Sequence, residues 1–213
     1  MKRTLAFAAS LLLLGACSSD GYTIRGKIAG LDNPYVYLLR YTGEVEVIDS
    51  AKVTKGDFVF KGKAEQPEVV YLSTDKQQPF VHFFLENGRI SVDGALSAPA
   101  DIAVLGTPSN DIQRAFDEQI AALEEEFAKA GNDMQRDSLR KEYSKLMSDA
   151  VEMNRDNIYG VTTFLNNAYA FLSPEEVMEQ IALFPAEWQQ RRELTELREA
   201  TERKLRVSAG HPY

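Results

Sequence analysis

At residues 102–127 the sequence is IAVLGTPSNDIQRAFDEQIAALEEEF, and its hydrophobic periodicity changes at Pro108. Before this proline, apolar and polar residues alternate, which is typical of a half-buried strand. After it, apolar residues recur at helical spacing and form one stripe: Ile112, Phe116, Ile120, Leu123 and Phe127. The stretch therefore divides the chain into an N-terminal β region and a C-terminal helical region, which predicts an α+β fold.

The β region covers residues 22–108 and alternates short strands with turn residues. Strands are expected at residues 22–28, 35–41, 44–51, 58–61, 68–73, 80–85, 89–93 and 102–105. Asn87-Gly88 lies between two apolar runs and predicts a two-residue hairpin, because a type I′ turn needs positive φ at both positions. We expect an antiparallel β-sandwich or an open barrel.

The helical region covers residues 109–207, and Asn110 is expected to cap its first helix, with Gln113 three residues later. Later helices are expected after Gly131-Asn132-Asp133 to near Gly160, over residues 161–172, after Ser173-Pro174-Glu175-Glu176, and from Pro185 onward. Ser173 followed by a proline and two acids is typical of a capped helix start. The region is therefore expected to contain helices alone.

The first residues resemble the signal peptide of a bacterial lipoprotein. Lys2 and Arg3 precede an apolar run of residues 5–14, and Leu14-Gly15-Ala16-Cys17 follows. The run is about ten residues long, whereas a membrane-spanning helix needs about twenty. We expect residues 1–16 to be a signal peptide cleaved between Ala16 and Cys17, Cys17 to be lipidated through its thiolate, and residues 17–21 to form a lipidated tether.

Charge and the lipid anchor limit the partners of the chain. The net charge is −8, which disfavours nucleic acid and anionic membrane surfaces as partners. The membrane is instead expected to be reached through acyl chains on Cys17, which anchor stably when there is more than one. Ser18 follows the cysteine, where enteric-type sorting places Asp in proteins kept at the inner membrane. We therefore expect an outer-membrane protein that faces the periplasm.

No group of residues predicts catalysis or a cofactor. The sequence holds one cysteine and two histidines, and lipidation of Cys17 leaves no thiol for disulfide exchange. His82 lies in an apolar strand without a second histidine at metal spacing, so we interpret it as structural or partly exposed. Glu124-Glu125-Glu126 is typical of a solvated helix face. We expect no catalytic residue, no metal and no cofactor.

Several segments in order resemble a known domain. They are Ile24-Arg25-Gly26-Lys27-Ile28, Gly56-Asp57-Phe58-Val59-Phe60-Lys61-Gly62, Phe83-Phe84-Leu85-Glu86-Asn87-Gly88-Arg89-Ile90-Ser91-Val92 and Val104-Leu105-Gly106-Thr107-Pro108-Ser109-Asn110. Together they resemble the DUF4369-type β domain at the N-terminus of exported thioredoxin-like thiol:disulfide interchange lipoproteins, over residues 21–110. In that family a helical stretch follows, and then a thioredoxin-like domain with Cys-x-x-Cys. Residues 208–213 resemble the linker to that domain, whose cysteines have no matching positions here.

The resemblance implies a fold and a location in the cell envelope, and it leaves two hypotheses for function. The first is a lipid-anchored, non-catalytic binding or interaction module. The alternative is an accessory or shortened N-terminal part of a thiol:disulfide interchange lipoprotein, with a thioredoxin-like envelope protein as its partner. A carboxylate-based hydrolase is disfavoured because no pair of acids is placed for it.

Overall fold

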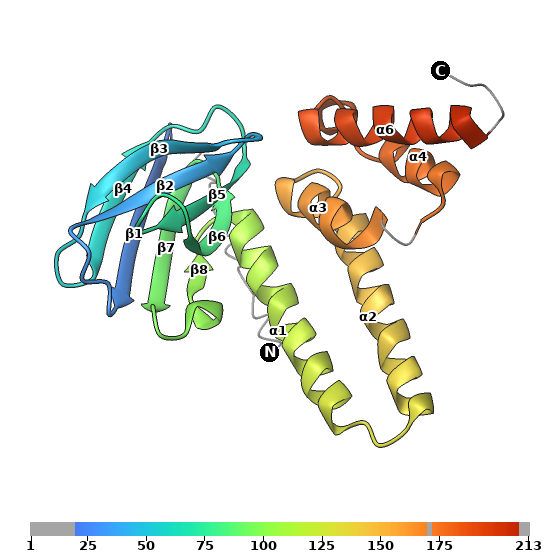
Figure 1. The fold of residues 1–213 in the computed structure, drawn as a ribbon, viewed down its shortest axis with the longest axis horizontal. Coiled ribbons are helices and arrows are strands. Elements are labelled where there is room, and N and C mark those ends of the chain that lie inside the picture. The colour runs from blue at the N-terminus through green and yellow to red at the C-terminus, as the bar shows by residue number, and fades with distance from the viewer. Residues whose placement is uncertain (1–19, 170–171, 209–213) are drawn as a thin grey trace, which may run out of the picture.

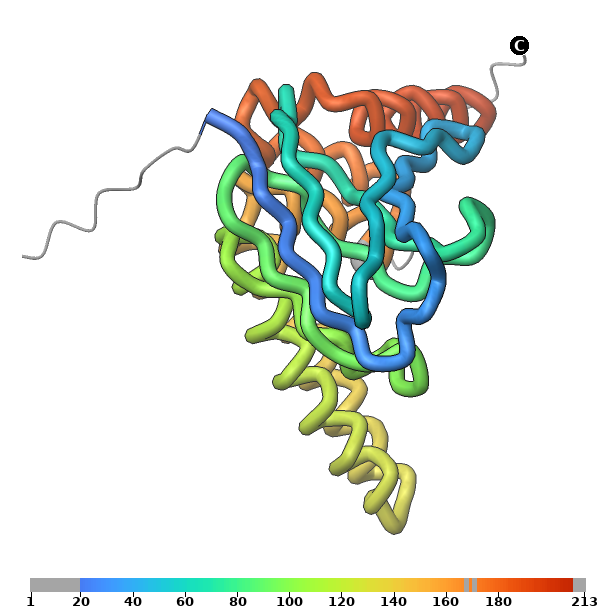
Figure 2. The backbone as a smooth tube through the Cα atoms, turned by 90° about the vertical axis from the view of Figure 1, so that its left-hand side faces the viewer, coloured from blue at the N-terminus to red at the C-terminus, as the bar shows by residue number. Residues whose placement is uncertain are grey.

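The computed structural model describes residues 20–169 and 172–208. Two packed four-stranded sheets are followed by helices (Figure 1). The α+β class and the sandwich form of the β region are therefore confirmed. Figure 2 shows the helices lying behind the sandwich when the strands face the viewer.

Each sheet combines strands that are distant in sequence. Sheet A has the order β4 (Asp57–Gly62), β1 (Tyr22–Ala29), β7 (Gly88–Ala95), β8 (Ala103–Leu105). Sheet B has the order β3 (Val45–Lys52), β2 (Tyr35–Tyr41), β5 (Glu68–Ser73), β6 (Pro79–Leu85). The pairing of β1 with β7 is parallel, and the other named strand pairs are antiparallel. One parallel pairing inside sheet A is the main departure from the expected antiparallel sandwich.

The sandwich core follows from the alternation in the strands. In β1 the inward side chains of Tyr22, Ile24 and Ile28 are buried. Gly26 takes the remaining inward position, where an added Cβ would lie 1.9 Å from Cζ of Phe58. The missing side chain therefore makes room for an aromatic ring, and burial of such a ring contributes about 1.5–3 kcal/mol.

The predicted hairpin at Asn87-Gly88 is wrong. β6 pairs with β5 in sheet B, whereas β7 pairs with β1 and β8 in sheet A, so the chain changes sheets at this point. The φ of Gly88 is 152°, far from the roughly +60° to +90° of a type I′ turn. The Asn87 side chain is used elsewhere, since it accepts from the Ala64 amide at 2.9 Å and donates to the Ala64 carbonyl at 2.8 Å.

The helices form a long hairpin and a smaller group that returns to the sandwich (Figure 1). They are α1 (Pro108–Lys129), α2 (Asp133–Met153), α3 (Ile158–Thr163), the π-helix η2 (Phe164–Ala168), α4 (Pro174–Ala182), α5 (Ala186–Gln189) and α6 (Arg192–Ser208). The cap at Ser173 is confirmed: Ser173 Oγ accepts from the Glu176 amide at 3.2 Å, and Glu176 Oε2 accepts from the Ser173 amide at 2.8 Å. Among the described residues, no helix is both long and apolar enough to cross a membrane.

Two helix boundaries differ from the expectation. The second helix ends at Met153 and not near Gly160, because Asn157 begins a new helix by accepting from the Gly160 amide at 3.1 Å. The segment after Pro185 forms two helices, α5 and α6, because the chain turns at Gln190 and Arg191. This turn places Arg191 between helices, where it faces the sandwich.

The interpretation of Asn110 as a helix cap is also wrong. Thr107 precedes α1 as its N-cap, and Asn110 lies inside the first turn with 2% of its surface exposed. Its Oδ1 accepts from the Phe84 amide at 2.9 Å, and its Nδ2 donates to the Phe84 carbonyl at 2.8 Å and to Thr107 Oγ1 at 2.7 Å. The side-chain amide thus takes the place of a neighbouring strand at the edge of β6 and fixes α1 to sheet B.

A cluster of aromatic side chains joins the helices to the outer face of sheet B. Phe84 from β6 lies edge-on to the Tyr159 ring at 6.1 Å, and Phe116 from α1 stacks on the same ring at 5.5 Å. Burial raises the pKa of Tyr159 to about 12. The helices therefore pack against the sandwich through a dry contact as well as through Asn110.

Replacing Asn110 with Ala should lower the free energy of unfolding by about 2–4 kcal/mol, because buried backbone groups of Phe84 lose their partners. Asn87→Ala is the matched control, since it removes the same pair of bonds from an exposed side chain. There water can replace the amide, and we expect a loss below about 1 kcal/mol. Denaturant unfolding measures both, and equal losses would contradict the strand-replacing role of Asn110.

Candidate functional site

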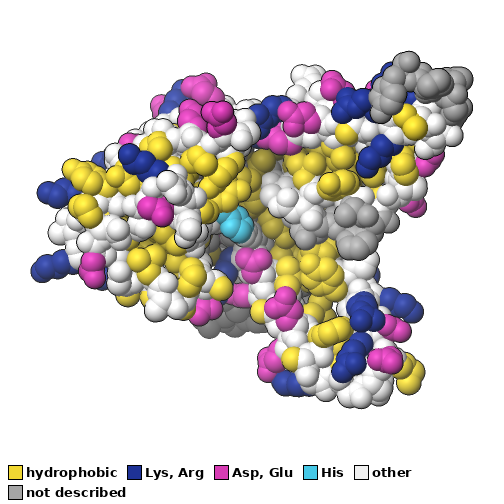
Figure 3. Space-filling model, in the orientation of Figure 1, with side chains coloured by type: hydrophobic (Ala, Val, Ile, Leu, Met, Phe, Trp, Pro, Cys, Tyr) yellow, Lys and Arg dark blue, Asp and Glu magenta, His cyan; other side chains and the backbone are white. Residues whose placement is uncertain are grey.

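A cavity of about 880 Å³ lies between the outer face of sheet B and the returning helices. Figure 3 shows the hollow between the two parts of the molecule. His82 lines it and is exposed. Cavities between structural units are common ligand sites, because each unit contributes different side chains. We take this hollow as the candidate site and call it the junction cleft.

The floor of the junction cleft contains three rings from sheet B. Tyr71 and His82 are cross-strand partners, so their side chains share one face of the sheet, the outer one. Their rings lie 6.0 Å apart. Tyr41 approaches Tyr71 edge-on at 4.7 Å. Burial raises the pKa of Tyr71, so its hydroxyl is protonated at neutral pH and can donate a hydrogen bond.

A bidentate ion pair lies beside these rings. Arg40 donates to both carboxylate oxygens of Glu68, with Nη2 to Oε1 at 2.7 Å and Nε to Oε2 as the second contact. The hydrogen bond to Glu68 raises the pKa of Arg40. A bulge between Leu38 and Leu39 changes the register of β2 just before Arg40, and bulges commonly redirect side chains in this way. The pair is a fixed polar element of the floor.

The opposite wall comes from the helices. Its apolar part consists of Ile158, Val161 and Leu165, and its neutral polar part consists of Thr162, Asn166 and Gln190. Arg191, Arg192 and Glu193 add charged groups to the same side. Within the described ranges, the side chains of the neutral polar residues make no hydrogen bond to other protein groups. Their donors and acceptors are therefore available to a molecule in the cleft.

Arg191 lines the cleft where α5 leads into α6. Its side chain is 9% exposed, and its guanidinium lies 5.3 Å from the centre of the Trp188 ring. Nη1 donates to Gln66 Oε1 over 3.4 Å, and Glu193 Oε2 is 3.7 Å from Nε. Arg191 is thus a largely buried cation with one donor, Nε, that lacks a hydrogen-bond acceptor among the described residues.

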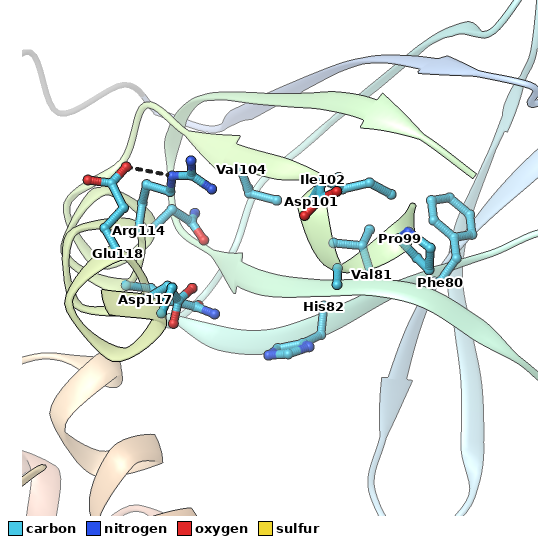
Figure 4. Close-up of a pocket in the computed structure, with 14 residues that line it drawn as sticks. Phe80, Val81, His82, Pro99, Asp101, Ile102, Val104, Arg114, Asp117 and Glu118 are labelled. Carbon is cyan, nitrogen blue, oxygen red and sulfur yellow. Dashed lines mark hydrogen bonds and ion pairs between the residues drawn. The ribbon is translucent and has the colours of Figure 1, made fainter. Parts of the chain in front are cut away.

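A second cavity of about 740 Å³ opens on the other side of β6, between the edges of the two sheets and α1. Figure 4 shows Val81 pointing toward Ile102 and Asp101, and His82 pointing the opposite way. On α1, burial raises the pKa of Asp117, and the charge of His82 lowers it in part. The cavity holds charged groups from the helix and apolar groups from the strands.

The residues expected from the sequence have different outcomes. Ala16, Cys17 and His211 lie outside the described residues. His82 lies on the outer face of β6 and is exposed. Phe84 on the same face is buried under the helices, whereas Phe83 and Leu85 point into the sandwich core. Glu124, Glu125 and Glu126 are exposed, which confirms the solvated helix face. Across the described part of the chain, no group of three or more His, Cys, Asp or Glu residues could hold a metal ion.

Arg40, Glu68 and Arg191 were not predicted. A signal for the floor does exist in the sequence, because β5 has apolar residues on both faces: Val70 and Leu72 inward, Val69 and Tyr71 outward. Such a strand is expected when a second layer covers the sheet. For Arg191 the sequence offers no comparable signal, since arginines are frequent in the last part of the chain.

Residues 22–113 match the model of a family described as Domain of unknown function (DUF4369). Neither a curated protein nor a solved structure matches the chain. The family is uncharacterised and supplies no catalytic residue. The match includes the floor of the junction cleft and Asn110, and it ends before the helix wall and Arg191. The cleft therefore combines the matched domain with residues that lie beyond it.

His82→Gln should change the free energy of unfolding by less than about 0.5 kcal/mol, because an exposed side chain without a hydrogen bond is replaced. It should also raise the pKa of Asp117 further, since the charge that lowers it is lost. A folded-state pKa above the ordinary 3.8 favours the folded protein at low pH, and this contribution disappears as the pH rises through the folded pKa. NMR titration of the Asp117 carboxyl measures the shift, and a fall in pKa would contradict the assignment.

Proposed function

We propose that the protein is a lipid-anchored, non-catalytic binding module of the bacterial cell envelope and that its ligand occupies the junction cleft. The proposal that the protein binds a ligand rests on one observation, the way in which the cleft is built. Its floor and its wall come from separate parts of the chain, and Asn110 and the Tyr159 cluster fix these parts to each other. Preorganised walls of this kind reduce the entropy lost on binding.

The groups in the cleft support binding over catalysis. Glu68 accepts hydrogen bonds from Nε and Nη2 of Arg40, so each of its carboxylate oxygens already has one donor and the group is held in place. Tyr71 has a raised pKa, which makes it a donor and a poor base or nucleophile at neutral pH. A general base needs a free acceptor within hydrogen-bond reach of the proton that it removes. Besides acceptors on Glu65, His82 and Glu193, the cleft offers fixed donors and ring faces, which suit recognition.

The proposed lipid anchor is inferred from the sequence. Leu14-Gly15-Ala16-Cys17 follows a short apolar run with two preceding cations. The cleft belongs to a folded body whose first described strand begins at Tyr22, a few residues after Cys17. A tether of this length would hold the body close to the membrane surface.

Replacing Cys17 with Ala should move the protein from the detergent phase to the aqueous phase, or leave an uncleaved precursor in the membrane. The reason is that acyl chains on the thiol are the proposed anchor. Triton X-114 partitioning together with the mass of the mature N-terminus measures both results. A cleaved variant that still partitions fully with detergent would refute the anchor.

The cleft is tested with Tyr71→Ala and, as a matched control, Tyr35→Ala. Tyr35 lies in the same sheet with 47% of its surface exposed and does not line the cleft. Ligands found in a screen of the full-length protein in micelles should bind at least about tenfold more weakly to Tyr71→Ala, because ring stacking is lost. Tyr35→Ala should bind them as the unchanged protein does. Equal affinities for the two variants would show that binding occurs elsewhere.

A second candidate is an accessory role beside a thioredoxin-like envelope protein. The observation that favours it is the order of motifs through residues 21–110, which resembles such lipoproteins and overlaps the family match. The sequence has one cysteine, so disulfide exchange would require thiols of the partner. This role would replace the binding module if the protein increased the reductase rate of a Cys-x-x-Cys protein from the same cell.

A further inference from the structure

We propose that the ligand of the junction cleft is an acidic saccharide, a chain of sugar rings in which a carboxylate binds Arg191. This inference rests on the proposed function and adds the chemical class of the ligand. Three features of the cleft support it independently: the state of Arg191, the rings of the floor and the unpaired polar groups of the helix wall.

The Nε donor of Arg191 has no hydrogen-bond acceptor among the described residues. The side chain is 9% exposed, yet its described contacts are a 3.4 Å hydrogen bond to Gln66, an ion pair to Glu193 at 3.7 Å and stacking on Trp188. Buried charges are normally paired and hydrogen-bonded, because removing them from water is costly. A planar carboxylate matches the fork of a guanidinium and can accept two bonds from it. A carboxylate in the cleft would therefore complete the coordination of Arg191.

Glu193 is placed to give way to such a ligand. Its side chain is 40% exposed, whereas that of Arg191 is 9% exposed. At 3.7 Å the pair is longer than a charge-assisted hydrogen bond of about 2.7–2.9 Å. A ligand carboxylate can compete with Glu193, while the buried Arg191 stays in position against Trp188. The ion pair thus holds the site in a state that an acidic ligand can displace.

The floor suits a ring with an apolar face. Tyr41, Tyr71 and His82 form a connected group of rings along the outer face of sheet B. Sugar rings present C–H groups on their faces, and aromatic rings pack against such groups while their polar tips reach water. A ring on Tyr71 would lie beside the Arg40–Glu68 pair, which provides fixed polar atoms for hydroxyl groups.

The neutral part of the helix wall suits hydroxyl groups. Thr162, Asn166 and Gln190 line the cleft, and their side chains both donate and accept hydrogen bonds. Hydroxyl groups do the same, so each can be satisfied in either orientation. A peptide with a free carboxylate would also bind Arg191, but each of its amide groups has a fixed donor and a fixed acceptor, whereas a hydroxyl group can donate or accept at the same position. The arrangement therefore favours a saccharide.

The test uses the full-length protein in detergent micelles and matched pairs of probes. Trimers of galacturonic acid and of mannuronic acid are compared with their methyl esters, which have the same rings without charge, by isothermal titration calorimetry. At least one acidic trimer should bind at least tenfold more tightly than its ester. Arg191→Gln should lower the affinity for the acidic trimer to that for its ester. Tyr71→Ala should lower the affinity for both forms.

Arg155→Gln is the matched control for Arg191. Nε of Arg155 also lacks a hydrogen-bond partner among the described residues, but Arg155 lies outside the cleft and bonds to Gln180 at 3.1 Å. This variant should keep the preference for acid over ester. Because Arg191→Gln removes stacking on Trp188 and can disturb folding, Glu193→Gln is a second test. It removes the competing carboxylate, so it should raise the affinity for the acidic trimer several-fold without changing the affinity for the ester.

The outcomes separate the inference from the proposed function. If acid and ester bind equally and both depend on Tyr71, the cleft binds saccharides and the role of Arg191 in recognising a carboxylate is overturned. If no saccharide binds but a hexapeptide binds through its free carboxylate and not as its amide, the saccharide class is overturned. If Tyr71→Ala changes the binding of no ligand at all, the proposed function fails together with the inference.

Discussion

The bond between the Asn110 side chain and the Phe84 backbone determines how the two parts of the molecule meet. An exposed strand edge presents unpaired amide and carbonyl groups, which proteins usually cover or block. Here a single amide satisfies both groups of Phe84, at 2.8 and 2.9 Å, and it comes from the first turn of α1. The direction in which α1 leaves the sandwich is therefore set at its start. The position of every later helix depends on that direction.

From this starting point the helices cover only part of sheet B. Phe84 and its partner Val69 lie under the Tyr159 cluster, whereas Tyr71 and His82, one repeat further along the same strands, remain open. The outer face of one sheet is thus divided into a dry contact and an accessible floor. The junction cleft forms at this division, and Arg191 reaches it because the chain turns between α5 and α6.

Much of the fold could be predicted from local patterns, because period and turn residues act within a few positions. The strand positions, the stripe on α1 and the cap at Ser173 agree with the structure. Two of the errors occurred where a residue typical of a local role has a long-range one. Asn87 and Asn110 resemble turn and cap residues, yet each bonds to the backbone of another segment more than twenty positions away. No local pattern distinguishes these two uses of an asparagine amide.

The cleft was harder to predict than the fold for the same reason. His82 was singled out as a lone histidine, but its chemical setting comes from Tyr71 across the sheet and from Asp117 on α1. Arg191 is unusual because packing beside Trp188 leaves its Nε buried without an acceptor among the described residues. Neither property exists before the helices dock, so the sequence contains the residues but not their environment.

The boundary of the family match divides the cleft in a way that bears on recognition. Residues 22–113 provide the rings and the Arg40–Glu68 pair, whereas the largely buried Arg191 and the neutral polar wall come from residues beyond 113. The ring-lined floor forms wherever the helices leave part of the outer face of sheet B uncovered. The charge and hydrogen-bonding character opposite it depend on the helices attached. In the binding mode that we propose, the β domain would supply a platform for rings, and the helical region would determine which substituents on those rings are recognised.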